Sequence, residues 1–252
     1  MQGLISVEKS DRIAKINYGG ARGARPHFGK RGENSGMRMR TKTWAKPELS
    51  ACPYYIPEPE ALRGNWQKSF GAKRPIHLDL GCGKCVFLAE AAKRHGNVNY
   101  VGIDLSYDIL GVGRRKIQSV FGDSDPDNVL LCYYNIEKLP RLFTPEEGIE
   151  RLYINFCNPW PAAKHHKRRL THTRQLEAYL PLLESGGEIW FKTDNDDLYL
   201  ATKRYFAEAG LKIFFDTQDL HGTHDPENIL TEHEILFTGQ GIKTKALRAR
   251  KA

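Results

Sequence analysis

The chain has 252 residues, a formal net charge of +8 and 40% hydrophobic residues. This length fits one large α/β domain with appendages better than two full domains. No stretch approaches the roughly 18 uncharged apolar residues of a membrane span, and the N-terminus lacks an apolar signal-peptide core, so we expect no membrane segment and a cytoplasmic protein.

The first residues form appendages to the main domain. Residues 1–36 are rich in glycine and basic residues, which predicts a flexible basic extension, and Met37 offers a second start immediately after it. Residues 37–75 form an N-terminal arm with two Pro-bounded segments and a short helix near 58–69. Residues 76–252 form the main domain.

Strands and helices alternate from His77 onward. Apolar runs predict strands at 75–80, 98–104, 128–134, 151–156, 188–193, 211–217 and 231–239. Helical patterns cover 84–96, 106–121 after an N-cap Ser106, 171–187 ended by Gly186 and Gly187, and 196–210. This alternation predicts an α/β fold: a doubly wound, mostly parallel seven-stranded sheet with helices on both faces. The last two strands have no helix between them, which indicates an antiparallel strand at one edge.

The residues at the first three strand ends suggest a nucleoside pocket, because ligands of open α/β sheets bind at the carboxyl ends of strands. Gly81 and Gly83 in the first turn let the backbone approach a ligand closely. Asp104 ends the second strand, where a carboxylate can accept hydrogen bonds from both ribose hydroxyls, and Asn135 follows the third, where it can read an adenine edge. The turn does not match the dinucleotide pattern G-x-G-x-x-G. Asp79 can instead pair with the cationic amino acid part of S-adenosylmethionine.

The cysteines and histidines do not predict a metal site. The five cysteines are an odd number, and the C-x-x-C formed by Cys82 and Cys85 has neither a second ligand pair nor a thioredoxin context. The histidines at 165–166, 221 and 224 lack further ligands at suitable spacing. We therefore expect reduced thiols and no metal.

Clusters of basic residues occur at 38–46, 164–169 and 243–251. A solvated surface explains any single cluster, but three of them beside a nucleoside pocket favour a nucleic-acid partner. Lys167, Arg168 and Arg169 are the candidates to grip phosphates on either side of a target base.

Six segments occur in the order seen in the bacterial tRNA (guanine-N7-)-methyltransferases, and the chain resembles this family over residues 37–246. The segments are DLGCGK, GIDLS, NFCNPWP, KHHKRRL, EIWFKTDN and TEHE. The resemblance implies the class I methyltransferase fold, a methyltransferase domain at 76–252 and S-adenosylmethionine as donor. It also implies tRNA as partner, with a guanine of the variable loop as the acceptor.

The resemblance assigns roles residue by residue. The implied cofactor contacts are Asp79, Gly81, Gly83, Asp104, Asn135 and Asn158. The implied substrate contacts are Asp194, Thr231, Glu234, Lys167, Arg168 and Arg169. The chain departs from the family pattern at Cys85, which replaces a third glycine, at Asn158, which replaces the common aspartate, and at Ala162 and His233, which replace a lysine and an aromatic residue.

The chemistry of guanine N7 makes Asn158 and Asp194 the catalytic candidates. N7 carries an in-plane lone pair and no proton, so the reaction needs alignment and facing charge rather than a strong base. An amide at Asn158 keeps the hydrogen-bonding reach of a carboxylate, and Asp194 can face the cationic product.

Two alternatives stay open. Asn158-Pro159-Trp160 is similar to the N-P-P-Y motif that methylates exocyclic amines of bases, although that motif has a proline where Trp160 stands. The departures at Cys85 and Ala162 also fit a tRNA-binding protein that has lost methyl transfer.

Overall fold

The computed structural model describes residues 41–251. The extension expected at 1–36, and the part of the first basic cluster that precedes Thr41, lie outside these residues. None of the helices in the described part of the chain has the length and apolar character needed to cross a membrane.

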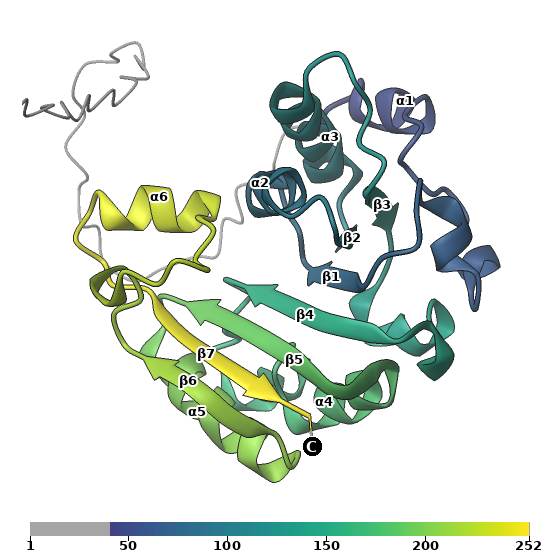
Figure 1. The fold of residues 1–252 in the computed structure, drawn as a ribbon. Helices are drawn as coiled ribbons and strands as arrows, with labels where there is room; N and C mark the ends of the chain where they lie inside the picture. Colours follow the sequence, from purple (N-terminus) through teal and green to yellow (C-terminus); the bar gives the residue numbers. More distant parts are fainter. Residues whose placement is uncertain (1–40, 252) are drawn as a thin grey trace, which may run out of the picture. The chain divides into compact units, whose positions relative to one another are not determined.

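A seven-stranded sheet in the order β3-β2-β1-β4-β5-β7-β6 forms the centre of the fold (Figure 1). Its strands are β1 (Ile76–Leu80), β2 (Asn99–Asp104), β3 (Val129–Tyr133), β4 (Ile149–Asn155), β5 (Leu183–Thr193), β6 (Lys212–Thr217) and β7 (Lys245–Arg250). The strands from β3 to β5 pair in parallel, and β7 is antiparallel to both neighbours. The predicted α/β fold with a mostly parallel sheet is confirmed.

Helices cover both faces of this sheet. They are α1 (Ala45–Ser50), α2 (Val86–Arg94), α3 (Tyr107–Phe121), α4 (Thr173–Tyr179), α5 (Asp196–Glu208) and α6 (Glu232–Thr238). Figure 1 shows α2 and α3 over the β1–β3 half, and α4 and α5 on the opposite side, behind β5 and β6. The Ser106 side chain accepts a hydrogen bond from the Ile109 N–H at 3.3 Å, which confirms the expected start of α3.

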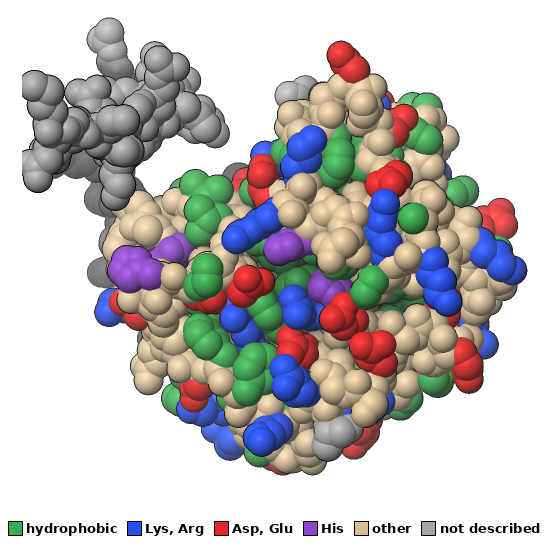
Figure 2. Space-filling model, in the orientation of Figure 1, with side chains coloured by type: hydrophobic (Ala, Val, Ile, Leu, Met, Phe, Trp, Pro, Cys, Tyr) green, Lys and Arg blue, Asp and Glu red, His purple; other side chains and the backbone are tan. Residues whose placement is uncertain are grey.

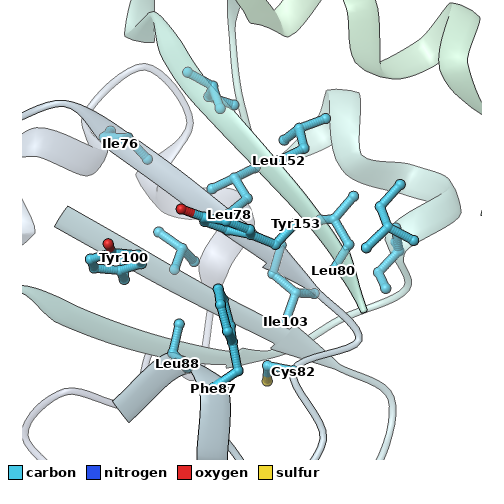
Figure 3. Close-up of a cluster of buried hydrophobic side chains, with 14 of the residues drawn as sticks. Ile76, Leu78, Leu80, Cys82, Phe87, Leu88, Tyr100, Ile103, Leu152 and Tyr153 are labelled. Carbon is cyan, nitrogen blue, oxygen red and sulfur yellow. The ribbon is translucent and has the colours of Figure 1, made fainter. Parts of the chain in front are cut away.

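The core lies where α2 packs on β1, β2 and β4 (Figure 3). Leu78 and Leu80 of β1 are fully buried, as is Ile103 of β2. Phe87 of α2 meets Tyr153 of β4 edge-on, with ring centroids 4.7 Å apart. A central parallel strand is covered on both faces, and all five residues of β1 are buried, including His77 and Asp79.

The arm at 41–75 belongs to the same compact unit as the sheet. Gly111 permits α1 and α3 to cross closely, because a Cβ there would lie 2.6 Å from the Ala45 Cβ. The Trp66 indole is fully buried and donates a hydrogen bond to the Leu142 carbonyl at 2.8 Å. The short helix expected near 58–69 is instead two 3-10 turns, Pro59–Leu62 and Trp66–Ser69.

The helix expected at 171–187 is shorter than the prediction. It ends at Tyr179, and a 3-10 turn at Leu180–Leu182 leads into β5. Pro181 has no N–H to continue the helical hydrogen bonds. Gly186 and Gly187 therefore lie within β5, beside the shift in its register with β4, and do not end a helix.

The strand expected at 231–239 is wrong, because these residues form α6. The Thr231 hydroxyl accepts from the Glu234 N–H at 3.1 Å, and the Glu234 carboxylate accepts from the Thr231 N–H at 2.9 Å. This reciprocal capping box starts a helix.

The seventh strand is β7, within the basic cluster at 243–251, and it lies between β5 and β6 rather than at an edge. Arg248 is 9% exposed, pairs with Asp225 and lies 3.6 Å over the Trp190 ring. Its charge is thus matched within the fold, although the sequence places it in a basic cluster. Figure 2 shows basic and acidic side chains interspersed on the visible face, without a continuous basic stripe.

Candidate active site

The polar residues predicted at the strand ends meet at one edge of the sheet. Asp79 pairs in register with Gly102 of β2 and with Tyr153 of β4, and Asn155 pairs with Lys192 of β5. Because these strands are parallel, their carboxyl ends open on the same side.

The turn after β1 has the open backbone expected of a ligand cradle. Gly81 has φ +84° and Gly83 has φ +53°, conformations that favour glycine. Among the described atoms, none lies within 4 Å of the position that a Cβ on Gly81 would take. The Gly83 N–H donates to the Asp104 carboxylate at 3.1 Å, which joins the turn to the end of β2.

Cys85 adopts the left-handed backbone that a third glycine would favour, with φ 54°. Its fully buried thiol sits against Gly113 of α3, where an added Cβ would lie 2.4 Å from the Cys85 Sγ. The Cys82 and Cys85 sulfurs are 3.8 Å apart and both thiols are free. Among residues 41–251, no group of three or more His, Cys, Asp or Glu side chains is arranged to hold a metal.

A buried acid, Asp79, and a half-buried acid, Asp104, lie beside the turn. Asp79 is 2% exposed, and burial raises its pKa to about 7 against the opposing effect of the Asn155 amide. Burial also raises the pKa of Asp104, while the Gly83 N–H acts in the opposite direction. Each carboxyl group is therefore poised to gain from a cationic or hydroxyl-bearing ligand.

Asn155 was missed by the sequence reasoning. Its side-chain NH₂ donates to Asp79 at 3.5 Å, and its Oδ1 is buried with no partner among the described residues. The signal available in the sequence was its place at the end of β4, beside β1. Asn135 follows β3 as predicted and is half-buried, and its Oδ1 caps the next 3-10 turn by accepting from the Glu137 N–H at 3.0 Å.

The loop at 156–160 follows β4 and has a strained backbone. Phe156 and Trp160 have φ 51° and 43°, conformations that cost about 1–3 kcal/mol each in non-glycine residues and persist only when the surroundings impose them. Asn158 is exposed in this loop, and its Oδ1 accepts from the Trp160 N–H at 3.0 Å.

Arg169 connects the loop at 156–160 to α5. It is 1% exposed, donates through Nε to the Pro159 carbonyl at 2.7 Å and pairs with Asp197 of α5 at 2.5 Å. The expected phosphate contact is therefore wrong for Arg169, whose guanidinium faces the protein. Lys167 and Arg168 are exposed, and the Arg168 guanidinium lies 5.1 Å from the Trp160 ring centroid.

The remaining predicted substrate residues lie at the ends of β5 and α6. Asp194 follows β5 and is half-buried, and its backbone carbonyl accepts from the Lys245 ammonium at 2.9 Å. Thr231 and Glu234 are 5% and 0% exposed, because the capping box turns both side chains inward. The sequence predicted that Glu234 contacts the substrate, whereas in the structure its side chain is buried and does not face a base.

Aromatic side chains line the rim between β4 and α6. The Phe156 and His233 rings stack with centroids 5.2 Å apart and planes 12° apart, and Phe237 lies 5.7 Å from His233. The sequence reasoning noted His233 but missed Phe156, since its left-handed backbone leaves no signal in the sequence.

Comparisons with known proteins show which family this chain resembles. The model of a family described as a putative methyltransferase matches residues 73–247. A protein of Clostridium beijerinckii named tRNA (guanine-N(7)-)-methyltransferase is 46% identical over 217 residues, which cover 85% of this chain and 99% of that protein. A protein of the same name from Clostridium perfringens is 44% identical over 218 residues, covering 85% and 100%. Among solved structures, the 16S rRNA methyltransferase KamB is 14% identical, with a TM-score of 0.49, over 86% of this chain and 97% of that one.

Proposed function

The chain belongs to the tRNA (guanine-N(7)-)-methyltransferase family, and from this premise we propose that it transfers a methyl group from S-adenosylmethionine to N7 of a guanine in tRNA. We place the target guanine in the variable loop and the reaction in the cytoplasm. The observation that carries the proposal is the meeting of the glycine turn, Asp79 and Asp104 at the carboxyl edge of the sheet.

The residues at this edge fit the donor. Its cationic amino group would find the Asp79 carboxyl group and the unpartnered Asn155 Oδ1 side by side. Asp104 would accept hydrogen bonds from the ribose hydroxyls, and Asn135 would contact the adenine edge. The open space at Gly81 would let the ligand approach the backbone closely. S-adenosylmethionine supplies an electrophilic methyl group on a sulfonium sulfur.

The protein's own residues have to align the base and match its charge. Guanine N7 needs no deprotonation, so positioning can supply up to ~7–11 kcal/mol of the barrier reduction. The strained loop at 156–160 presents Asn158 beside the end of β4, and Asp194 follows the neighbouring strand. An ionised Asp194 would stabilise the positive charge that develops on the base. Lys167 and Arg168 would contact the tRNA backbone.

The aromatic rim gives the base a surface to stack on. Phe156 and His233 are held nearly parallel at the same edge as Asn158. Stacking on an aromatic side chain contributes about 1–3 kcal/mol per base. The rim therefore supports a nucleobase as the acceptor.

Methylation of unmodified tRNA with labelled donor tests this proposal. Borohydride reduction and aniline cleavage break the chain at N7-methylguanine, so a single cleavage in the variable loop is the expected result. The control is Asp104→Ala, which should bind no donor and give no cleavage. Methyladenine or methylcytosine as product would favour the exocyclic-amine alternative, and tRNA binding without any transfer would favour a binding protein.

A further inference from the structure

α6 is attached to the fold in an unusual way. Its only buried residue is Glu234, whereas Ile235 and Leu236 are 58% and 56% exposed. Helices are ordinarily held by an apolar face against the core. The buried anchor of this helix is instead a carboxylate, while His233 and Phe237 pack with Phe156 at the rim.

That carboxylate is enclosed by hydrogen bonds from β5 and from the loop that precedes α6. Its Oε2 accepts from the Lys192 ammonium at 3.0 Å and from the Thr231 N–H at 2.9 Å, and its Oε1 accepts from the Asn228 amide at 3.2 Å. The Lys192 ammonium also donates to the Ile229 carbonyl at 2.9 Å. Burial lowers the pKa of Lys192, and the facing Glu234 carboxylate opposes that shift. Both oxygens of Glu234 are occupied by protein donors.

We propose that Lys192 and Glu234 form a latch that positions the α6 segment, residues 225–238, over the carboxyl edge, and that Glu234 acts through Lys192 rather than by binding guanine. This inference rests on the proposed function, because it concerns how tRNA is received. Two observations place the latch beside the site. Lys192 lies on β5, two residues before Asp194, which follows the strand, and Glu232 of α6 pairs with Lys84 of the glycine turn at 2.6 Å.

The latch predicts a distinctive pattern of mutational effects. Removing one charge leaves the other buried and unpaired, whereas neutralising both is tolerated, and Gln at position 234 keeps the capping bond from the Thr231 N–H. Lys192→Met and Glu234→Gln should each lower kcat/KM for tRNA by about 100-fold, the loss expected when a positioned element moves by about 1 Å. Most of that loss should be a rise in KM, because tRNA binding depends on the placed segment.

The Lys192→Met/Glu234→Gln double variant is the decisive protein. If the pair only positions α6, the double variant recovers most of the tRNA KM. If Glu234 binds the guanine edge, the double variant stays as poor as Glu234→Gln, and the proposal is overturned. Thermal unfolding of all three variants shows whether either single-site variant fails to fold. In that case the tRNA KM of the double variant is compared directly with that of the unaltered protein.

Amide hydrogen exchange provides a readout that does not depend on activity. Protection in α6 should fall in each single variant and return in the double variant, while protection in α5 serves as the internal reference. Unchanged α6 protection in folded single variants would refute the latch. If the unaltered protein does not methylate tRNA, the proposed function fails, yet the exchange pattern still tests the latch.

Discussion

Arg168 and Arg169 are neighbours in one basic cluster, yet Arg168 is exposed and Arg169 is buried. Arg169→Ala removes a charged hydrogen bond to the Pro159 carbonyl, which contributes about 1.5–3 kcal/mol. The ion pair with Asp197 adds at most about 1 kcal/mol, because the Asp197 side chain is 65% exposed. We therefore expect the free energy of unfolding to fall by about 2–4 kcal/mol. The loop at 156–160 should also relax from its strained backbone, which lowers kcat.

The assay combines urea unfolding with tRNA binding measured over a range of salt concentrations. Arg168→Ala is the matched control, because that side chain is exposed in the same segment. It should leave stability unchanged and reduce the logarithmic salt slope by roughly 0.7–0.9. Arg169→Ala, measured where it remains folded, should keep the full slope. A stable Arg169→Ala variant with a reduced slope would show that the guanidinium contacts phosphate and that its burial has been misread.

Further predictions concern the donor pocket and catalysis. Asp104→Ala should abolish donor binding without unfolding the protein, and calorimetry showing unchanged affinity would remove Asp104 from the pocket. Cys85→Gly should lower the free energy of unfolding by about 1–2 kcal/mol in urea titration, because relief of the left-handed backbone offsets the added chain entropy but not the loss of a fully buried thiol. Asp194→Asn should lower the initial rate on tRNA far more than Asn158→Asp, and the reverse order would favour the exocyclic-amine reaction. Since burial raises the pKa of Asp79 to about 7, donor affinity measured by calorimetry should strengthen as pH rises through that value. The stability of the ligand-free protein should decline as pH rises from the ordinary carboxyl pKa of 3.8 to about 7, because the folded state holds the Asp79 proton more tightly than the unfolded state. Asp79→Asn should flatten both profiles.

Much of the proposed donor pocket was predictable from the sequence by itself. Buried parallel strands are covered on both faces, so a strand such as β3 reads as a continuous apolar run. The acids at 79 and 104 lie at the carboxyl ends of two such buried strands, and parallel strands open these ends at one edge. Short-range pattern therefore sufficed to place Asp79, Asp104 and the glycine turn together.

Only the tertiary structure decided the substrate side of the site. The residues of α6 are too few for period alone to distinguish a helix from a strand, and the Thr231-x-x-Glu234 capping box was the one local signal for a helix start. The inward burial of Glu234 against Lys192 of β5 is what the sequence could not show. β7 has an unusually basic sequence for an inner strand, and it is accommodated because Arg248 pairs with Asp225 and stacks on Trp190. Whether a basic side chain faces solvent or the protein depends on partners far away in the chain, which is why sequence could not separate Arg169 from Arg168.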